Sequence, residues 1–288
     1  ITNNSAFDNK SDGTLTNYGK VEALVGTLTN SGTFNNTKTS ESINATFNIV
    51  GTFLNKDSGT IVNTGIVENK TNGTITNPGT IDNRLTLLNN AIINTTGSFL
   101  NKTTGVFTNN LTLNNNTGGT IDNDGSFTNA STASFNNYAT VINDSLLIGF
   151  GTIKNFKTAI VTNNKEFQIK KLLKNYGTIT NNKTLKSYDN TTFENYNLIT
   201  NASEGSIETN NVFINKKINA TNNDSIDLTG ITGTINNSGT ITHKNSTYTN
   251  NGLISNLSTG TFQIKDSLVF GSTGKIINSN TITLDSTF

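Results

Sequence analysis

Apolar and polar residues alternate along this chain in short units, and no stretch follows a helical period. A typical unit is a Gly, a Thr, an aliphatic residue or Phe, a variable residue and an Asn. Clear copies begin at Gly13, Gly73, Gly119, Gly177 and Gly233. Because a period of two is the pattern of a strand with one buried face, each unit predicts a short β-strand whose apolar residue points inward.

Gly and Asn bracket each expected strand, and both residue types tolerate the backbone conformations of tight corners. We expect the Gly before the strand to lie at a corner and the Asn at its end to turn inward beside the next corner. The clearest corner and ladder positions are Gly73, Asn77, Gly119, Asn123, Gly177, Asn181, Gly233 and Asn237.

The units start six or eight residues apart, as at Gly59, Gly65, Gly73 and Gly79, so that three steps span twenty residues. This period predicts three strands per coil and about fourteen coils in 288 residues. The predicted fold class is therefore all-β, a parallel β-helix (solenoid) forming a single domain over residues 1–288 without a clear linker or capping domain. Since parallel connections are right-handed in ~98% of sheets, we expect a right-handed solenoid.

Stacking explains why such strands coil instead of forming hairpins. A short strand with one large inward side chain cannot bury that side chain alone, whereas equivalent strands of successive coils form a continuous apolar column. Identical positions then lie above one another, about 4.8 Å apart. We expect the inward Asn side chains to form hydrogen-bonded ladders, which explains why a polar residue recurs at a partly buried position.

The composition agrees with a solenoid and excludes several classes of protein. Hydrophobic residues make up 32% of the chain and charged residues 14%, both low for a layered globular domain. The net charge is +1 without a run of Lys or Arg, so we expect neither nucleic acid nor anionic lipid as a partner. No stretch approaches the ~18 apolar residues of a membrane span, so we expect no membrane insertion.

The chain contains no Cys, which excludes disulfides and thiolate metal sites. It also begins at Ile1 and contains no Met, so we expect a chain that has been processed or truncated, most simply by removal of a signal peptide.

The repeated Gly-Thr-apolar-x-Asn units resemble those of prokaryotic β-solenoid surface proteins: autotransporter passengers, filamentous-haemagglutinin-like exoproteins and archaeal Asn/Thr-rich adhesin-like proteins. The resemblance covers nearly the whole chain. It implies an exported protein that acts in attachment, surface layers or fibres and has no active site along its shaft.

A polysaccharide-acting enzyme of the pectate-lyase-like fold is the alternative, because fold alone does not decide function. Such an enzyme needs clustered carboxylates and usually a cation. The chain has one Arg, Arg84, and one His, His243, which replaces the motif Asn. Asp144, Asp189 and Glu194 are expected to be isolated, so we predict no catalytic residues and no enzyme activity.

The segment Asp122-Asn123-Asp124-Gly125-Ser126 is similar to an acidic calcium loop, with oxygen ligands at alternate positions before a Gly. It lacks the later Glu of such loops. We therefore expect no metal and no cofactor.

A solenoid that binds glycans or ice is a third possibility. Thr-x-Thr pairs such as Thr74/Thr76 and Thr178/Thr180 could order water on a flat face, but other units break the array. Tyrosines could stack on sugars, although Tyr in a strand is more often core packing. The candidates are Tyr138, Tyr176, Tyr188, Tyr196 and Tyr248.

Asn-x-Ser/Thr sequons are frequent, as an Asn- and Thr-rich composition produces. Eleven of them are Asn44, Asn69, Asn94, Asn101, Asn129, Asn143, Asn182, Asn201, Asn219, Asn245 and Asn256. We expect those at the motif Asn to face inward, whereas corner sequons such as those at Asn101 and Asn219 can carry glycans. We expect glycosylation at Asn101, Asn219, Asn69 and Asn245.

Repeat-like sequence continues from Ile1 to Leu284 without an amphipathic cap. Bare strand edges recruit further strands. We therefore expect an extracellular or cell-surface structural protein that forms the subunit or shaft of a filament or adhesin. Its expected partners are further copies of itself joined end to end, or other surface components, with glycans as possible partners.

Overall fold

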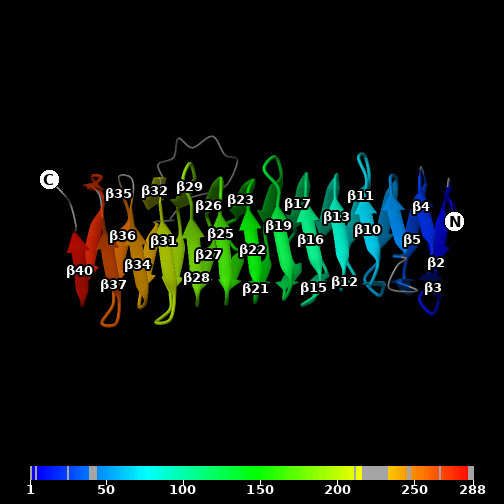
Figure 1. Ribbon diagram of the computed structural model, residues 1–288, viewed down its shortest axis with the longest axis horizontal. Coiled ribbons are helices and arrows are strands. Elements are labelled where there is room, and N and C mark those ends of the chain that lie inside the picture. The colour runs from blue at the N-terminus through cyan, green and yellow to red at the C-terminus, as the bar shows by residue number, and fades with distance from the viewer. Residues whose placement is uncertain are drawn as a thin grey trace. The chain divides into compact units, whose positions relative to one another are not determined.

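The computed structural model describes residues 2–3, 5–24, 26–38, 44–210, 212–215, 233–244, 248–265 and 267–284. The described chain consists of short parallel β-strands in two compact units, Ile1–Leu147 (unit 1) and Ile148–Phe288 (unit 2). In Figure 1 the strands of each unit lie side by side in chain order. Every third strand joins the same sheet, which makes three sheets, A, B and C. The expectation of a single domain over residues 1–288 stays a prediction.

Unit 1 has seven described strands in each sheet. Sheet A contains β1 (Thr2–Asn3), β4 (Lys20–Ala23), β7 (Thr46–Ile49), β10 (Ile66–Asn69), β13 (Thr86–Asn89), β16 (Val106–Asn109) and β19 (Ser126–Asn129). Sheet B contains β2 (Phe7–Asn9), β5 (Thr27–Asn30), β8 (Thr52–Asn55), β11 (Thr74–Asn77), β14 (Ile92–Thr95), β17 (Thr112–Asn115) and β20 (Ser134–Asn137). Sheet C contains β3 (Thr14–Asn17), β6 (Thr33–Asn36), β9 (Thr60–Asn63), β12 (Thr80–Asn83), β15 (Ser98–Asn101), β18 (Thr120–Asn123) and β21 (Thr140–Asn143).

Unit 2 has six described strands in each sheet, and β22 (Leu146–Gly149) contains the division between the units. Sheet A contains β25 (Glu166–Ile169), β28 (Thr184–Ser187), β31 (Ser206–Thr209), β34 (Thr240–His243), β37 (Thr261–Ile264) and β40 (Thr281–Leu284). Sheet B contains β23 (Thr152–Asn155), β26 (Leu172–Asn175), β29 (Thr192–Asn195), β32 (Val212–Asn215), β35 (Tyr248–Asn250) and β38 (Leu268–Phe270). Sheet C contains β24 (Ile160–Asn163), β27 (Thr178–Asn181), β30 (Leu198–Asn201), β33 (Thr234–Asn237), β36 (Leu253–Asn256) and β39 (Lys275–Asn278).

The register of these strands confirms the predicted parallel β-solenoid. Thr80 of β12 pairs with Thr60 of β9, twenty residues earlier. β12 is parallel to both of its neighbours, β9 and β15. Some coils are longer, because Leu198 pairs with Thr234 across 36 residues. The described residues form seven coils in unit 1 and six in unit 2, slightly fewer than the fourteen expected from the repeat. Right-handedness stays a prediction.

The interior of each coil is filled by the second and fourth residues of its strands. Phe34 of sheet C, Phe47 of sheet A and Phe53 of sheet B are fully buried and meet with ring centroids 4.6 to 6.3 Å apart. Burying one such side chain contributes about 2–3 kcal/mol. Strand residues one and three point outward, as the alternating burial of β11 shows. The three sheets therefore enclose one narrow apolar column within each unit.

The corners are short turns that connect one sheet to the next. In the turn after β10, the N–H of Gly73 donates to the backbone O of Lys70 at 2.8 Å, and Asn72 has a φ of 72°. Asn190 takes the same left-handed conformation with a φ of 61°. Asn is the residue other than Gly that best tolerates this region, so its abundance suits the corners as well as the ladders.

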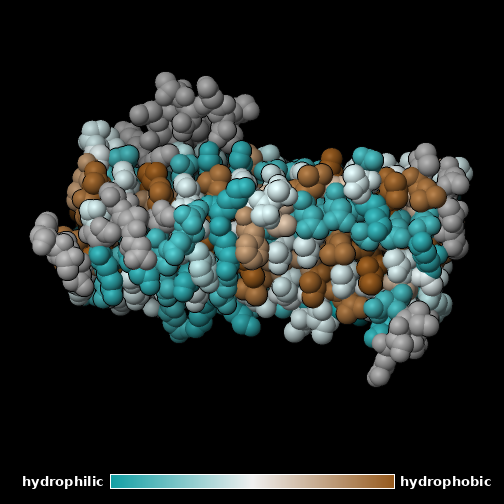
Figure 2. Space-filling view, turned by 45° about the horizontal axis from the view of Figure 1, so that its top comes forward, coloured by the Kyte–Doolittle hydropathy of each residue, from teal (hydrophilic) through white to brown (hydrophobic). Residues whose placement is uncertain are grey.

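The visible surface is largely polar, with apolar groups scattered among hydrophilic ones (Figure 2). Within the part of the chain that the structure describes, no helix has the length and hydropathy that crossing a membrane requires.

Candidate functional site

The Asn that ends most strands turns its side chain inward, into a column of hydrogen-bonded amides. In sheet C of unit 1, Nδ2 of Asn101 donates to Oδ1 of Asn123, and Nδ2 of Asn123 donates to Oδ1 of Asn143, both at 2.7 Å. Nδ2 of Asn123 also donates at 3.0 Å to the backbone O of Leu146, the first residue of β22, which is the strand that follows Asn143. Each amide therefore links two coils and also closes a corner.

The other predicted ladder residues occupy equivalent positions. Oδ1 of Asn77 accepts from Nδ2 of Asn55 at 2.7 Å. In unit 2, Nδ2 of Asn181 donates to Oδ1 of Asn201 at 2.8 Å. Asn237 and Asn256 form the same bond at 2.8 Å. Asn77, Asn123, Asn181 and Asn237 are all fully buried, so these amides replace water as one another's hydrogen-bond partners.

The predicted corner glycines lie where the chain passes closest to the preceding coil. A Cβ on Gly73 would stand 2.5 Å from the backbone O of Ile49, and one on Gly177 would stand 2.3 Å from the backbone O of Ala159. Both distances are shorter than a carbon atom tolerates, so the absence of a side chain allows the coils to stack. Gly119 and Gly233 stand at the same position, directly before β18 and β33.

Sheet A departs from this pattern in two stretches, because β4 and β7 end in Ala23 and Ile49 and the sheet A strands of unit 2 end in residues other than Asn. Its ladder runs from Asn69 through Asn89 and Asn109 to Asn129, with Nδ2 to Oδ1 distances of 2.7 Å. In unit 2 the column position is instead taken by Ile169, Ser187, Thr209, His243 and Ile264. Asn69 is the first member of its ladder and its buried Oδ1 has no hydrogen-bond partner within the described residues.

A second interruption lies in sheet B, at Thr95. Nδ2 of Asn77 donates to Oγ1 of Thr95 at 3.0 Å, and that hydroxyl donates back to the backbone O of Asn77 at 3.1 Å. Thr95 therefore has no donor for the next coil. Within the described residues, the buried Oδ1 of Asn115 has no partner as a result.

Ladder formation contradicts two of the expected glycosylation sites. Asn69 and Asn101 end strands β10 and β15, and their side chains are 0% and 1% exposed. Nδ2 of Asn69 donates to Asn89, and Nδ2 of Asn101 donates to Asn123, so neither nitrogen can accept a glycan in the folded chain. The expected corner placement of Asn101 was wrong, because Asn101 is the strand residue before the turn. Asn219 and Asn245 lie outside the described residues.

Six of the eleven sequons are buried in the ladders and three have an outward Asn. The outward three are Asn44, Asn94 and Asn182. Sequence reasoning placed no glycan on them. The alternation predicts an outward side chain for Asn94, the third residue of β14, whereas Asn44 precedes β7 and Asn182 follows β27.

The single Arg and single His are both engaged in structural contacts. Nε of Arg84, in the turn after β12, lies 3.1 and 3.0 Å from the two carboxylate oxygens of Asp82, the third residue of that strand. This ion pair raises the pKa of Arg84. His243 is fully buried at the ladder position of sheet A, with its Nδ1 2.7 Å from Oγ1 of Thr209. His243 is a polar substitution in a ladder, and the absence of enzyme activity stays a prediction.

Three carboxylates from adjacent coils come together on the outside of sheet C in unit 1. One oxygen each of Asp122, Asp124 and Asp144 lie within 4.8 Å of one another, and Nζ of Lys102 is 3.7 Å from Asp124. Desolvation of Asp122, followed by the charge of Asp124, raises the pKa of the Asp122 carboxyl. The expectation that Asp144 stands alone was wrong, because stacking brings it beside the preceding coil. The oxygen donors suit a hard cation in type.

Burial separates the five candidate tyrosines into two groups. Tyr176, Tyr196 and Tyr248 are at most 2% exposed and cannot stack on a sugar. Tyr138 is 36% exposed beside β20. Tyr188 is half-buried beneath Nζ of Lys170, which lies 4.1 Å from the ring centroid.

The outward threonines do not form a paired array. In unit 1, the first position of every described sheet C strand carries a hydroxyl. These residues are Thr14, Thr33, Thr60, Thr80, Ser98, Thr120 and Thr140. The third position of the same strands varies, with Val62, Asp82 and Leu100 in successive coils. A single column without its partner column lacks the two-dimensional order that ice binding needs.

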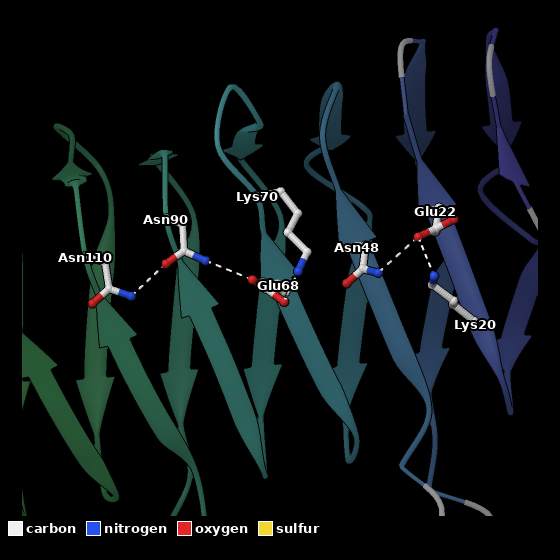
Figure 3. Close-up of polar contacts among 7 residues, drawn as sticks. All are labelled: Lys20, Glu22, Asn48, Glu68, Lys70, Asn90 and Asn110. Carbon is white, nitrogen blue, oxygen red and sulfur yellow. Dashed lines mark hydrogen bonds and ion pairs between the residues drawn. The ribbon is translucent and has the colours of Figure 1, made fainter.

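Outward asparagines form columns of their own, which sequence reasoning missed. On the corner after sheet A, Nδ2 of Asn110 donates to Oδ1 of Asn90 at 2.7 Å, and Nδ2 of Asn90 donates to Oε1 of Glu68 at 2.9 Å (Figure 3). Figure 3 also shows Nδ2 of Asn48 donating to Glu22, 3.3 Å away. The signal was available, because Asn recurs at twenty-residue intervals at positions that point outward.

On sheet B, a second column continues through three coils. Nδ2 of Asn114 donates to Oδ1 of Asn94 at 2.8 Å, and Nδ2 of Asn136 donates to Oδ1 of Asn114 at 2.9 Å. These three residues are the third residues of β14, β17 and β20. Unlike the interior ladders, they are partly exposed to solvent.

Comparison with known proteins gives little beyond this geometry. No family model matches the chain, and no curated protein matches it. Among solved structures, the chain is similar to the crystal structure of a TibA fragment that is hyper-glycosylated in a reaction catalysed by TibC. The alignment covers 97% of this chain and 99% of the TibA fragment, at 13% identity and a TM-score of 0.31. At that distance the properties of TibA do not transfer to this chain.

Proposed function

We propose that this chain is an extracellular structural protein without catalytic activity, the subunit or shaft of a surface filament or adhesin. In this proposal, copies join end to end through the edges of their solenoid sheets. Main-chain hydrogen bonds and contacts of the apolar column hold neighbouring copies together. Outward Thr, Asn and Lys side chains make many weak contacts with other molecules at the cell surface. The solenoid fold and the polar, weakly charged surface support this function.

The observation that carries the proposal is the exposed coil formed by β38, β39 and β40. Phe270 and Leu284 take the inward column positions of β38 and β40 and are 50% and 59% exposed, whereas Asn250 and Ile264, which precede them in the same columns, are fully buried. Exposed apolar residues on an unpaired strand edge favour pairing with another strand. In this proposal, the strands of a second copy pair with the coil of β38, β39 and β40 and cover these side chains.

The charge distribution supports a second copy as the partner. Unit 1 contains seven basic and ten acidic residues, a formal charge of −3, whereas unit 2 contains thirteen basic and nine acidic residues, a formal charge of +4. Unit 2 of one copy therefore attracts unit 1 of another. Because salt screens such attraction over about 8 Å at physiological ionic strength, association should weaken as salt is added.

Sedimentation velocity and negative-stain microscopy of the 288-residue chain test the proposal. We expect fibres or concentration-dependent oligomers, and Phe270→Lys should abolish them by placing a charge at the inward column position of β38. Val106→Lys is the matched control, because Val106 is similarly exposed, at 44%, but points outward from sheet A in unit 1. Discrete monomers at all concentrations, or equal loss of assembly in both variants, would contradict end-to-end joining.

A polysaccharide-acting enzyme is the second candidate, because Asp122, Asp124 and Asp144 provide carboxylates on adjacent coils. Its test is the release of new chain ends from polygalacturonate and from neutral polysaccharides. Under this candidate, release occurs and Asp124→Asn removes it. If the unmodified chain releases no ends from any of these polymers, this second candidate is wrong.

A further inference from the structure

The outward asparagines of unit 1 form two amide columns on neighbouring parts of the surface. We define the amide face as Asn90, Asn94, Asn110, Asn114 and Asn136. Asn90 and Asn110 precede β14 and β17 by two residues, while Asn94, Asn114 and Asn136 lie on β14, β17 and β20. The columns are therefore joined by the outward residues Ile92 and Thr112.

Hydrogen bonds along the columns fix the orientation of these side-chain amides but do not use all of their donors and acceptors. Each bond within the columns, at 2.7 to 2.9 Å, uses one N–H and one lone pair. An amide has two N–H donors and two acceptor lone pairs, so each side chain retains groups for a ligand. Within the described residues, Nδ2 of Asn94 and Oδ1 of Asn136 have no hydrogen-bond partner. The face thus presents donors and acceptors in fixed orientations, with little rotamer entropy left to lose.

The charge of this surface selects for an uncharged ligand. The outward positions of β14, β17 and β20 carry Ile, Thr, Ser and Asn, and none carries a charge. Glu68, which accepts from Asn90, lies at one edge of the face (Figure 3). An anionic or cationic polymer therefore finds no counter-charge along the columns, whereas hydroxyl groups match amides because both donate and accept.

The spacing of the columns selects for a repeating ligand. Successive amides are one coil apart, about 4.7–4.9 Å along the stack. A sugar chain lying along the columns presents hydroxyl groups at intervals of similar length, so several sugars can bind amides at once. Contacts repeated along one chain add up, so the affinity of the polymer exceeds that of its single unit.

Apolar side chains next to the amides provide a surface for the C–H faces of sugar rings. Tyr138 follows Asn136 by two residues and is 36% exposed, and Ile92 is 39% exposed next to Asn94. An aromatic ring beside planar polar groups combines a rigid apolar contact with orienting hydrogen bonds.

We propose that the amide face binds a neutral polysaccharide whose chain runs along the two amide columns. This assignment does not depend on end-to-end assembly, because the face lies on the outer side of unit 1 and not on the coil formed by β38, β39 and β40.

Depletion binding to insoluble cellulose, chitin and mannan, together with titration of soluble dextran, tests the proposal with the 288-residue chain made in a host without N-glycosylation. We expect saturable binding to at least one of these polymers. Asn114→Ala with Asn136→Ala should weaken it about tenfold through the loss of two sets of hydrogen bonds, and Tyr138→Ala should weaken it independently. Because the ligand is neutral, binding should not change between low and high salt.

Asn182→Ala is the matched control. Nδ2 of Asn182 donates to Oδ1 of Asn164 at 2.6 Å, so this variant removes one outward amide pair in unit 2 without touching the amide face. Thermal unfolding of every variant shows that it is folded. The proposal is overturned if the chain binds none of the four polymers, or if Asn182→Ala weakens binding as much as the amide-face variant.

Discussion

The interior and exterior asparagine columns consist of the same residue in the same stacked arrangement, yet they differ in burial and in how many of their hydrogen-bonding groups are used within the chain. Nδ2 of Asn123 donates to the next amide and to a backbone carbonyl, and its Oδ1 accepts from Asn101, all away from water. Asn114, on the surface, makes one bond in each direction along its column and remains partly exposed. Burial therefore decides whether a column holds the fold or is available to a ligand.

The largest expected difference between the two kinds of column is chemical access. If the folded chain is incubated with an oligosaccharyltransferase that accepts Asn-x-Ser/Thr and with its glycan donor, Asn44 and Asn182 should be modified and Asn69 and Asn101 should not. Mass spectrometry of peptides measures occupancy at each site. Unfolding the chain in urea first should make all four sites accessible, and modification of Asn101 in the folded chain would show that the ladder opens readily.

The second expected difference between interior and exterior columns is their contribution to the free energy of unfolding. Asn123→Ala should destabilise unit 1 by about 2–4 kcal/mol, because it removes three hydrogen bonds and leaves buried partners unsatisfied. Asn114→Ala, the exterior counterpart, should change stability by no more than about 0.5 kcal/mol. Urea unfolding and hydrogen exchange of the neighbouring amides measure both. Equal effects from the two substitutions would mean that interior and exterior columns do not differ in energy.

Repair of an interrupted ladder should have a smaller effect of the opposite sign. Thr95→Asn restores a donor for the buried Oδ1 of Asn115, so we expect a gain of about 1 kcal/mol in the free energy of unfolding. Thr112→Asn, the same change at an outward position of β17, serves as the control and should be close to neutral. A loss of stability in Thr95→Asn would mean that the corner after β14 does not admit the longer side chain.

The smallest effect is electrostatic and depends on pH. Desolvation and the neighbouring Asp124 raise the pKa of Asp122 above its usual 3.8, so the folded chain holds this proton more tightly than the unfolded chain. The contribution of protonated Asp122 to the free energy of unfolding is fully present below pH 3.8. It is lost as the pH rises through the raised pKa that Asp122 has in the folded chain. Asp122→Asn should therefore stabilise unit 1 by about 0.5 kcal/mol at neutral pH. The gain should disappear in acid, and thermal unfolding at several pH values measures it.

Local pattern was enough to predict the fold. The alternation from Thr74 to Asn77 gives the direction of each side chain, and the twenty-residue spacing gives the stacking, because both follow from strand geometry. The ladder positions follow as well, since a polar residue that repeats at an inward position needs a partner of its own kind.

Features that depend on the length of individual turns were beyond this reasoning. Asn101 was placed in a corner because the turn before Gly105 was expected to begin at Asn101. The turn begins at Lys102, and Asn101 is the last residue of β15. Asp144 was taken as isolated because its neighbours come from a preceding coil, and the outward columns of Asn94 and Asn114 were missed because they contain the same residue as the ladders. Each case needs the register of one coil on the next, which varies as turns gain or lose residues.

The interior ladders have a direction. Every amide donates toward the coil that follows it in the chain, as Asn101 does to Asn123 and Asn163 does to Asn181, so the first amide of a column presents a bare acceptor and the last presents a donor. Oδ1 of Asn69 shows this bare acceptor at the start of its column. Of the three columns, only that of sheet C has an amide, Asn278, in the coil of β38, β39 and β40, where Phe270 and Leu284 take the other two positions. An end-to-end arrangement therefore continues this column only where that coil of one copy meets the opening coil of another. A filament built in this way has two chemically distinct ends and can grow at different rates from each.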